Sequence, residues 1–194
     1  MTRPTGLTAI ALTIGLAQMT WAADLSDLPQ PPELRTESNY LTNEEVLFLP
    51  TDPAAAWTFF RENPITDYLE PTDRIPAITS IDVLKAPWGE AGSVRRVNLD
   101  GGGTVLERVL TSTDTEFTYQ IWDLQTDSGS FISHIYGEFR VRPANGGSEI
   151  VWRYNIAPNV FFARPFIRRF LDNDFEPFME GGIAGLDAAY QAQQ

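Results

Sequence analysis

The sequence predicts an α+β domain in which one antiparallel sheet is covered by a long C-terminal helix. Between residues 78 and 156, strand-like runs alternate with turn sequences such as Asn145-Gly146-Gly147, which is typical of consecutive hairpins. From Pro165 to the C-terminus, apolar residues recur mostly at helical spacing. A sheet with one apolar face needs a cover, and this last segment is the only one long enough.

The first residues predict export from the cytoplasm. Arg3 precedes an apolar run over residues 7–17, and Thr20-Trp21-Ala22 then provides a small-residue cleavage site. This order is typical of a cleavable signal peptide, and the run is shorter than the about 20 residues that a spanning helix needs. We therefore expect residues 1–22 to be a signal peptide and the protein to be periplasmic or secreted.

Residues 23–42 are polar and contain three prolines, so we expect an extended N-terminal lead-in before a domain over residues 43–194. The chain has no cysteine, so its stability must come from a hydrophobic core and not from disulfides. The formal net charge is −12 at pH 7. Such a surface repels nucleic acid, and we expect no nucleic-acid partner.

The elements of the domain follow from local signals. A first strand over residues 45–49 ends at Pro50, and Asp52 and Pro53 then predict the start of a helix that ends at Asn63-Pro64. A second short helix is expected over residues 65–69. The remaining strands are expected over residues 78–84, 93–99, 104–110, 116–124, 131–142 and 148–156. In the last helix, Pro177 should introduce a kink, and Gly181, Gly182 and Gly185 should weaken the middle.

Four segments in this order carry a resemblance to a known superfamily. They are Asp52-Pro-Ala-Ala-Ala-Trp57, Gly92-Ser-Val-Arg95, Gly103-Thr-Val-Leu-Glu-Arg108 and Gly147-Ser-Glu-Ile-Val-Trp152. Over residues 45–190 the chain resembles the START-like (SRPBCC) superfamily, also called the Bet v 1-like or polyketide cyclase/dehydrase and lipid-transport group. The resemblance implies a helix-grip fold, in which a curved antiparallel sheet wraps around a long C-terminal helix with a cavity between them. It implies no single activity, because this fold hosts carriers, receptors and enzymes.

The hairpin around Gly101 indicates which side chains face that cavity. A three-residue loop places Val97 opposite Val105 and Arg95 opposite Glu107, whereas a two-residue loop would pair Arg95 with Arg108, which like-charge repulsion disfavours. We therefore predict an inward Arg95–Glu107 pair, and the resemblance points the same way, because related pockets often keep a charged group at this place. On the surface such a pair would contribute under about 1 kcal/mol, but inside an apolar cavity it would hold the polar end of a ligand.

Strand alternation and the helical pattern extend this set. The predicted ligand-binding residues are Arg95, Val97, Leu99, Val105, Glu107, Phe117, Tyr119, Ile121, Phe139, Trp152, Tyr154, Phe178 and Ile183. In the strand over residues 131–142, Phe131 should also face inward. The opposite face of that strand should be solvated, and it comprises Ile132, His134, Tyr136, Glu138, Arg140 and Arg142.

We assign no catalytic residue, metal ligand or cofactor from the sequence. His134 is the only histidine, and no motif supports a nucleophilic triad around it. There is neither a cysteine nor a carboxylate cluster at ligand spacing. An acid–base enzyme could still use Arg95, Glu107 and Tyr119, although pairing with an arginine suits Glu107 better for holding a ligand than for transferring a proton.

The segment over residues 161–170 combines Arg164, Arg168 and Arg169 with four phenylalanines in an otherwise acidic chain. In one interpretation these arginines pair with nearby acids such as Asp172 and Asp174. In the other, they form a basic and aromatic patch that makes transient contact with an anionic membrane.

Together these observations predict a periplasmic domain that binds a hydrophobic or amphipathic small molecule, a lipid or an aromatic compound, in an internal cavity. The aromatic side chains on the inner face would hold its apolar body. Two alternatives stay open. The cavity could serve a cyclase/dehydratase-type enzyme acting on a hydrophobic substrate, or the same aromatic side chains could fill a core in a non-catalytic interaction domain. The sequence does not predict an oligomeric state.

Overall fold

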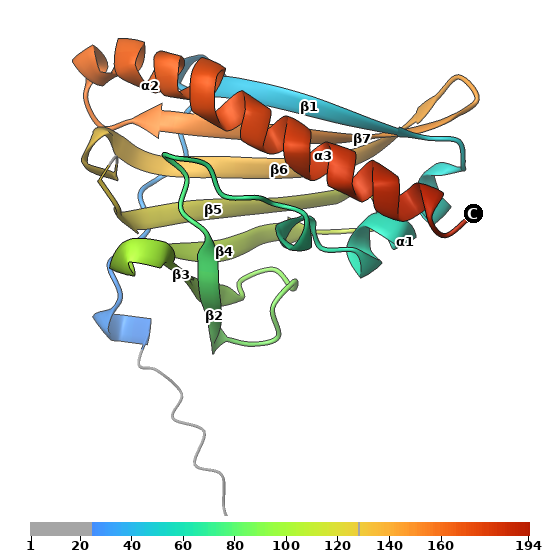
Figure 1. The fold of residues 1–194 in the computed structure, drawn as a ribbon. Helices are drawn as coiled ribbons and strands as arrows, with labels where there is room; N and C mark the ends of the chain where they lie inside the picture. The colour runs from blue at the N-terminus through green and yellow to red at the C-terminus, as the bar shows by residue number, and fades with distance from the viewer. Residues whose placement is uncertain (1–24, 128) are drawn as a thin grey trace, which may run out of the picture.

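The computed structural model describes residues 25–127 and 129–194 (Figure 1). The predicted signal peptide, residues 1–22, lies outside the described residues. Among the residues that the structure describes, none of the helices has both the length and the apolar composition needed to cross a bilayer.

A seven-stranded antiparallel sheet forms the scaffold, with strand order β1-β7-β6-β5-β4-β3-β2 (Figure 1). From β2 to β7 each strand pairs with the next one along the chain, and β1 adds to the far side of β7. The predicted meander is therefore confirmed. The strands are β1 Leu41–Leu49, β2 Ile78–Lys85, β3 Val94–Leu99, β4 Thr104–Ser112, β5 Glu116–Gln125, β6 Ile132–Ala144 and β7 Gly147–Pro158.

Helix α1, Pro53–Glu62, begins where the local signals predict. The carboxylate of Asp52 accepts hydrogen bonds from the backbone N–H groups of Ala54 at 3.0 Å and Ala55 at 3.1 Å, which satisfies two of the free donors at the helix start. The second predicted short helix is a single 3₁₀ turn, η3, Ile65–Asp67.

The C-terminal helix runs across one face of the sheet as α2, Arg164–Phe170, a π-helical turn, η7, Leu171–Phe175, and α3, Glu176–Gln191 (Figure 1). Pro177 has no N–H, and its ring disfavours the normal helical bond to residue 173. The predicted irregularity is therefore a wide turn directly before this proline. The sheet and this helix form the helix-grip fold.

Two of the glycines in α3 allow another segment to pack closely against it. A Cβ atom at Gly182 would lie 2.7 Å from Cδ2 of Leu69, and one at Gly185 would lie 2.9 Å from Cβ of Tyr68. The same glycines that weaken the helix thus let the chain after η3 approach the α3 backbone, which positions one wall of the site.

The lead-in before β1 covers the outer face of the sheet. The indole N–H of Trp122 donates to the carbonyl of Pro29, the Gln120 side chain donates to the carbonyl of Pro32, and Arg35 donates to the carbonyl of Pro158, each at 2.8 Å. The predicted extended path is interrupted by two 3₁₀ turns, η1, Leu25–Asp27, and η2, Glu37–Asn39. This cover removes part of the outer face from solvent.

The prediction of a fully solvated outer face on β6 is therefore wrong. His134 and Glu138 are buried, the latter beside Arg140 with a 2.6 Å ion pair. Ile132 faces the interior, because the register shifts between Ile132 and His134. Phe131, predicted to face inward, lies in a 3₁₀ turn, η5, Gly129–Phe131, and is 43 % exposed.

Candidate functional site: an internal cavity

A cavity of about 1540 Å³ lies between the sheet and the helices. The inner faces of β3 to β7 form one wall. The other walls come from α1, η3 and the segment after it, the β2–β3 connection, α2, η7 and α3. Exposed residues such as Asp73, Arg74 and Gly101 also border the cavity, so it opens to solvent. Its volume exceeds the range of about 300–1,000 Å³ that is usual for sites of drug-sized ligands.

The structure brings the predicted site residues together on this cavity wall, with one exception. Ile183 does not line the cavity and packs against the hydrophobic core instead. The reason is helix geometry: at about 100° per residue, Ile183 points about 140° away from Phe178, which does line the cavity. That the remaining predicted residues contact a ligand stays a prediction.

Other aromatic side chains on the wall were missed. Phe60 from α1, Phe170 from α2 and Phe175 from η7 line the cavity, as does Trp88 from the β2–β3 connection. The three phenylalanines belong to apolar helical patterns that could have indicated them. Trp88 stands in the turn sequence Pro87-Trp88-Gly89, where no periodicity assigns a direction.

Arg95 and Glu107 form the predicted ion pair. They lie opposite each other on β3 and β4, with 2.5 Å between Nε of Arg95 and Oε2 of Glu107. Their side chains are only 13 % and 9 % exposed, so the alternative of a surface bridge is wrong. The Arg95 guanidinium also lies 3.9 Å from the ring centroid of Trp88, a cation–π contact that holds it from a second side. The pair gives the cavity polarity without net charge.

Tyr119 lies beside this pair and depends on a glycine of the neighbouring strand. A Cβ atom at Gly137 would lie 2.1 Å from Cζ of Tyr119, so only glycine lets the ring occupy its place. Burial raises the pKa of Tyr119, as does the charge of Glu107, while the charge of Arg95 opposes the shift. The phenol therefore stays protonated at neutral pH and can donate a hydrogen bond.

Strand β7, beyond β6, adds a second phenol and a buried indole to this wall. Burial raises the pKa of Tyr154 well above its usual range, and the nearby Tyr119 and Glu107 act in the same direction. The indole N–H of Trp152 is buried and has no hydrogen-bond partner within the part of the chain that the structure describes. This wall of the cavity thus offers the two phenol O–H groups as donors to an oxygen of a ligand, while the buried Trp152 nitrogen is out of a ligand's reach.

The single histidine lies outside the cavity and serves the structure. His134 is fully buried, with Nε2 3.0 Å from the Tyr40 hydroxyl and Nδ1 3.2 Å from the Ser133 hydroxyl. The Tyr40 hydroxyl also accepts the backbone N–H of Arg35 at 2.9 Å. Since a hydroxyl can both donate and accept, either neutral tautomer of His134 satisfies both ring contacts, and the imidazole joins the lead-in to β6. The expectation of an exposed histidine was wrong because the lead-in covers it.

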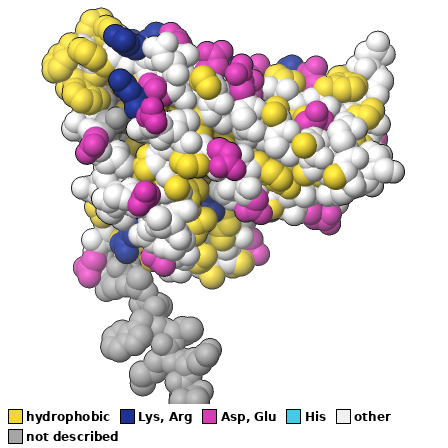
Figure 2. All heavy atoms as spheres, in the orientation of Figure 1, with side chains coloured by type: hydrophobic (Ala, Val, Ile, Leu, Met, Phe, Trp, Pro, Cys, Tyr) yellow, Lys and Arg dark blue, Asp and Glu magenta, His cyan; other side chains and the backbone are white. Residues whose placement is uncertain are grey.

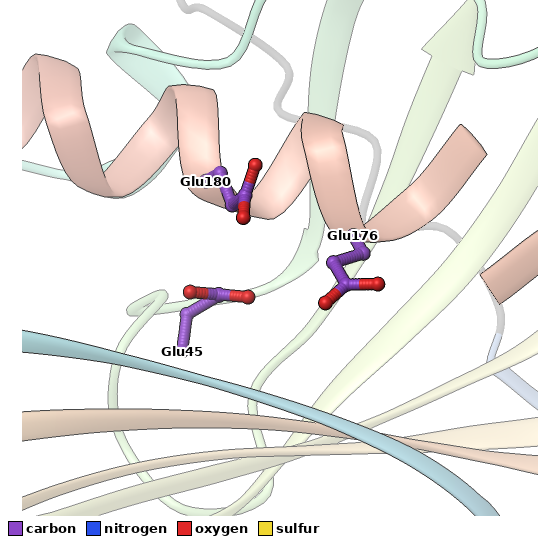
Figure 3. Close-up of side chains that lie close together, drawn as sticks. All are labelled: Glu45, Glu176 and Glu180. Atoms are coloured by element: carbon purple, nitrogen blue, oxygen red, sulfur yellow. The ribbon is translucent and has the colours of Figure 1, made fainter. Parts of the chain in front are cut away.

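The fold also brings together a carboxylate cluster that the sequence spacing did not indicate. Oxygen atoms of Glu45 on β1 and of Glu176 and Glu180 on α3 lie within 4.8 Å of one another (Figure 3). Burial raises the pKa of Glu45, and the charges of Glu180 and then Glu176 raise it further. The cluster lies outside the cavity wall. We assign it no metal, since surface acids often gather without one.

The curved sheet, the gripping helix and the large internal cavity define a protein of the helix-grip class. The chain belongs to the family described as Polyketide cyclase / dehydrase and lipid transport, whose profile matches residues 44–191. A search among curated protein sequences gives no match.

Several solved structures share the fold. The crystal structure of Ara h 8.0201 is similar with a TM-score of 0.58 and 21 % identity, over 79 % of this chain and 99 % of that one. The Zhui aromatase/cyclase from Streptomyces sp. R1128 gives a TM-score of 0.56 and 14 % identity, over 80 % and 96 %. The protein XoxI from Bacillus cereus gives 0.52 and 18 %, over 77 % and 95 %. At these identities the likeness concerns the fold alone, while the family suggests binding of a hydrophobic ligand or a cyclase-like function.

Proposed function

We propose that this domain binds an uncharged, hydrophobic or amphipathic small molecule, a lipid or an aromatic compound, in its internal cavity. The observation that carries the proposal is the buried Arg95–Glu107 pair on the inner wall of a cavity of about 1540 Å³. Desolvating two charges offsets much of their attraction, so such a pair adds little stability to a core. Facing a cavity, it orients the polar end of a ligand.

The chemistry of the wall supports an uncharged polar end on the ligand. The charges of Arg95 and Glu107 compensate each other, and the phenols of Tyr119 and Tyr154 are donors. A carbonyl, hydroxyl or ether oxygen matches these groups. A carboxylate at this place would be repelled by Glu107, and an ammonium would be repelled by Arg95. The rings of Phe117 and Phe139 on the sheet wall and of Phe178 on α3 suit an apolar or aromatic body.

We also propose that binding takes place in the periplasm or outside the cell. The support is the order of charge, apolar run and cleavage site in residues 1–22. Mass determination of the protein after export from an expression host tests this part, because removal of residues 1–22 is expected and an intact N-terminus contradicts it.

Native mass spectrometry of the exported protein, followed by organic extraction, tests the binding function. We expect a stoichiometric adduct or, with an empty cavity, saturable fluorescence of the uncharged probe N-phenyl-1-naphthylamine. Val105→Trp places an indole on the cavity wall beside the Arg95–Glu107 pair and should weaken either signal, whereas Val46→Trp adds the same side chain at an exposed position of β1 and should not. Absence of both adduct and probe binding in the wild type would refute the proposal.

A cyclase- or dehydratase-type enzyme is the second candidate, because the Glu107 carboxylate and the Tyr119 phenol meet on one cavity wall. Glu107→Gln separates the two functions. Loss of turnover of an aromatic or polyketide substrate with the fold and probe binding retained would favour the enzyme. If the extracted ligand is incubated with the protein and recovered in full and chemically unchanged, this result would favour the carrier.

A further inference from the structure

One end of the molecule exposes an unusual group of aromatic side chains. Phe161 is 87 % exposed, Phe162 71 % and Phe166 69 %, and they are the most exposed large apolar side chains of the described residues. Phe131, 43 % exposed, stacks on Phe166 with 6.4 Å between ring centroids. We call these four residues the aromatic patch. Figure 2 shows a group of hydrophobic side chains at the upper left, where α2 begins in Figure 1. Contiguous exposed apolar patches mark interaction sites.

Arginine side chains border the aromatic patch. Arg164, Arg168 and Arg169 all belong to α2, and Figure 2 shows Lys or Arg side chains directly beside the hydrophobic group. Arg168 pairs with Asp172 at 3.7 Å, but both side chains are about half exposed and such a pair is weak. Asp174, the other expected partner, pairs with Arg74 at 3.6 Å. Among the described residues, Arg164 and Arg169 form no ion pair, so the pairing interpretation accounts for Arg168 alone.

This local positive charge stands out because the chain has a formal net charge of −12. At physiological ionic strength, charges beyond about 8 Å are largely screened, so a surface that touches the patch meets the three arginines and the nearby Asp172 more than the net charge of the chain. The patch is therefore complementary to a partner that is both apolar and anionic.

The patch also adjoins the cavity. Ser130 and Phe170 line the cavity, and they are close chain neighbours of Phe131 and Phe166 in the patch. Buried Ile167, on the inner side of α2, fixes the helix to the core, so the exposed rings are carried by a firmly packed element.

We propose that this end of the molecule docks on the surface of an anionic phospholipid bilayer. The phenylalanine rings enter the boundary between headgroups and acyl chains, and the arginines contact the lipid phosphates. A second copy of the chain fits the patch less well, because a two-fold contact brings the arginines of both copies together. The proposal does not rest on the ligand in the cavity, and its test is independent of probe binding there.

Co-sedimentation of the exported protein with phospholipid vesicles tests the proposal. We expect binding to vesicles of equal parts phosphatidylcholine and phosphatidylglycerol, weaker binding to phosphatidylcholine alone, and a decrease as salt is raised. Phe161→Ser combined with Phe162→Ser, and separately Arg168→Glu combined with Arg169→Glu, should each reduce the affinity about tenfold or more.

Two control variants make changes of the same kind away from the patch, one to a single exposed phenylalanine and one to two basic residues. Phe48→Ser removes a phenylalanine that is 47 % exposed on β1, and Lys85→Glu with Arg142→Glu makes the same change in net charge. Both controls should bind as the wild type does. Absence of binding to anionic vesicles at low salt overturns the proposal, as does unchanged binding of both patch variants. A dimer in solution that the phenylalanine variant dissociates would assign the patch to a second copy and overturn it as well.

Discussion

The burial of His134 makes the stability of the protein depend on pH in a defined window. Burial lowers the pKa of His134 from 6.5 to about 4, and the charges of Arg35 and Arg108 act in the same direction. In the unfolded chain the imidazole is solvated and keeps its ordinary pKa. Between these two values the unfolded state binds a proton that the folded state does not, so acid favours unfolding.

The direction and size of this pH effect follow from the difference in the pKa of His134 between the folded and the unfolded state. The contribution of neutral His134 to the free energy of unfolding is fully present above pH 6.5 and is lost as the pH falls towards about 4. Each unit of pKa difference corresponds to about 1.4 kcal/mol, so the loss over this window is at most about 3 kcal/mol. That is a large share of the about 5–15 kcal/mol by which typical domains are stable.

Urea unfolding followed by tryptophan fluorescence at several pH values between 7 and 4 measures this loss. His134→Gln removes the titrating group, so we compare the two proteins at each pH and expect their difference in unfolding free energy to decline by up to about 3 kcal/mol as the pH falls. Carboxylates that titrate in the same window are common to both proteins and cancel. A difference that stays constant from pH 7 to pH 4 would refute the buried, neutral histidine and the cover that the lead-in provides.

Three further variants test the fold and the site. Asp52→Ala removes the cap of α1 and should lower the unfolding free energy by about 1 kcal/mol, measured by urea titration at pH 7. Gly137→Ala forces Tyr119 out of place, so it should lower the unfolding free energy by about 1–3 kcal/mol and weaken the binding of N-phenyl-1-naphthylamine. Gly181→Ala adds a Cβ that would meet nothing within 4 Å, so it should stabilise the helix. Glu45→Gln relieves repulsion within its cluster and should stabilise the protein by about 0.5 kcal/mol at pH 7. Because the pKa of Glu45 is raised, that gain should shrink at pH 4, where the wild-type carboxyl takes up a proton, and a gain independent of pH would contradict the clustering.

The parts of the site that could be predicted depend on neighbours close in the sequence. The three-residue loop around Gly101 sets the register of β3 and β4, and the register alone places Arg95 opposite Glu107. The period of two then assigns Val97 and Val105 to the same inner face, and the cap at Asp52 follows from residues two and three positions away.

The C-terminal helix shows where the pattern loses precision. Its length and apolar side were predictable, and Phe178 lines the cavity as expected. Ile183 was assigned wrongly, because an apolar stripe wide enough to meet both core and cavity does not reveal which of its members reaches the cavity.

The one-dimensional pattern thus specified the order of strands and helices, the register of the β3–β4 hairpin and the ion pair it carries. These features rest on local signals and on pairing across one short loop, which joins Arg95 and Glu107 at 12 positions apart. The folded chain added the features that join distant segments. Trp122 and Pro29 are 93 positions apart, yet their hydrogen bond helps fix the lead-in over the outer face, and Tyr40, at the end of that lead-in, meets His134. Glu45 meets two glutamates of α3 only because β1 pairs with β7 beneath that helix. Trp88 is only seven positions from Arg95, but it reaches the guanidinium from a connection without periodicity, so no pattern indicated this contact. Such contacts depend on how sheet, helix and lead-in pack in three dimensions, and they leave no periodic or local signal in the chain.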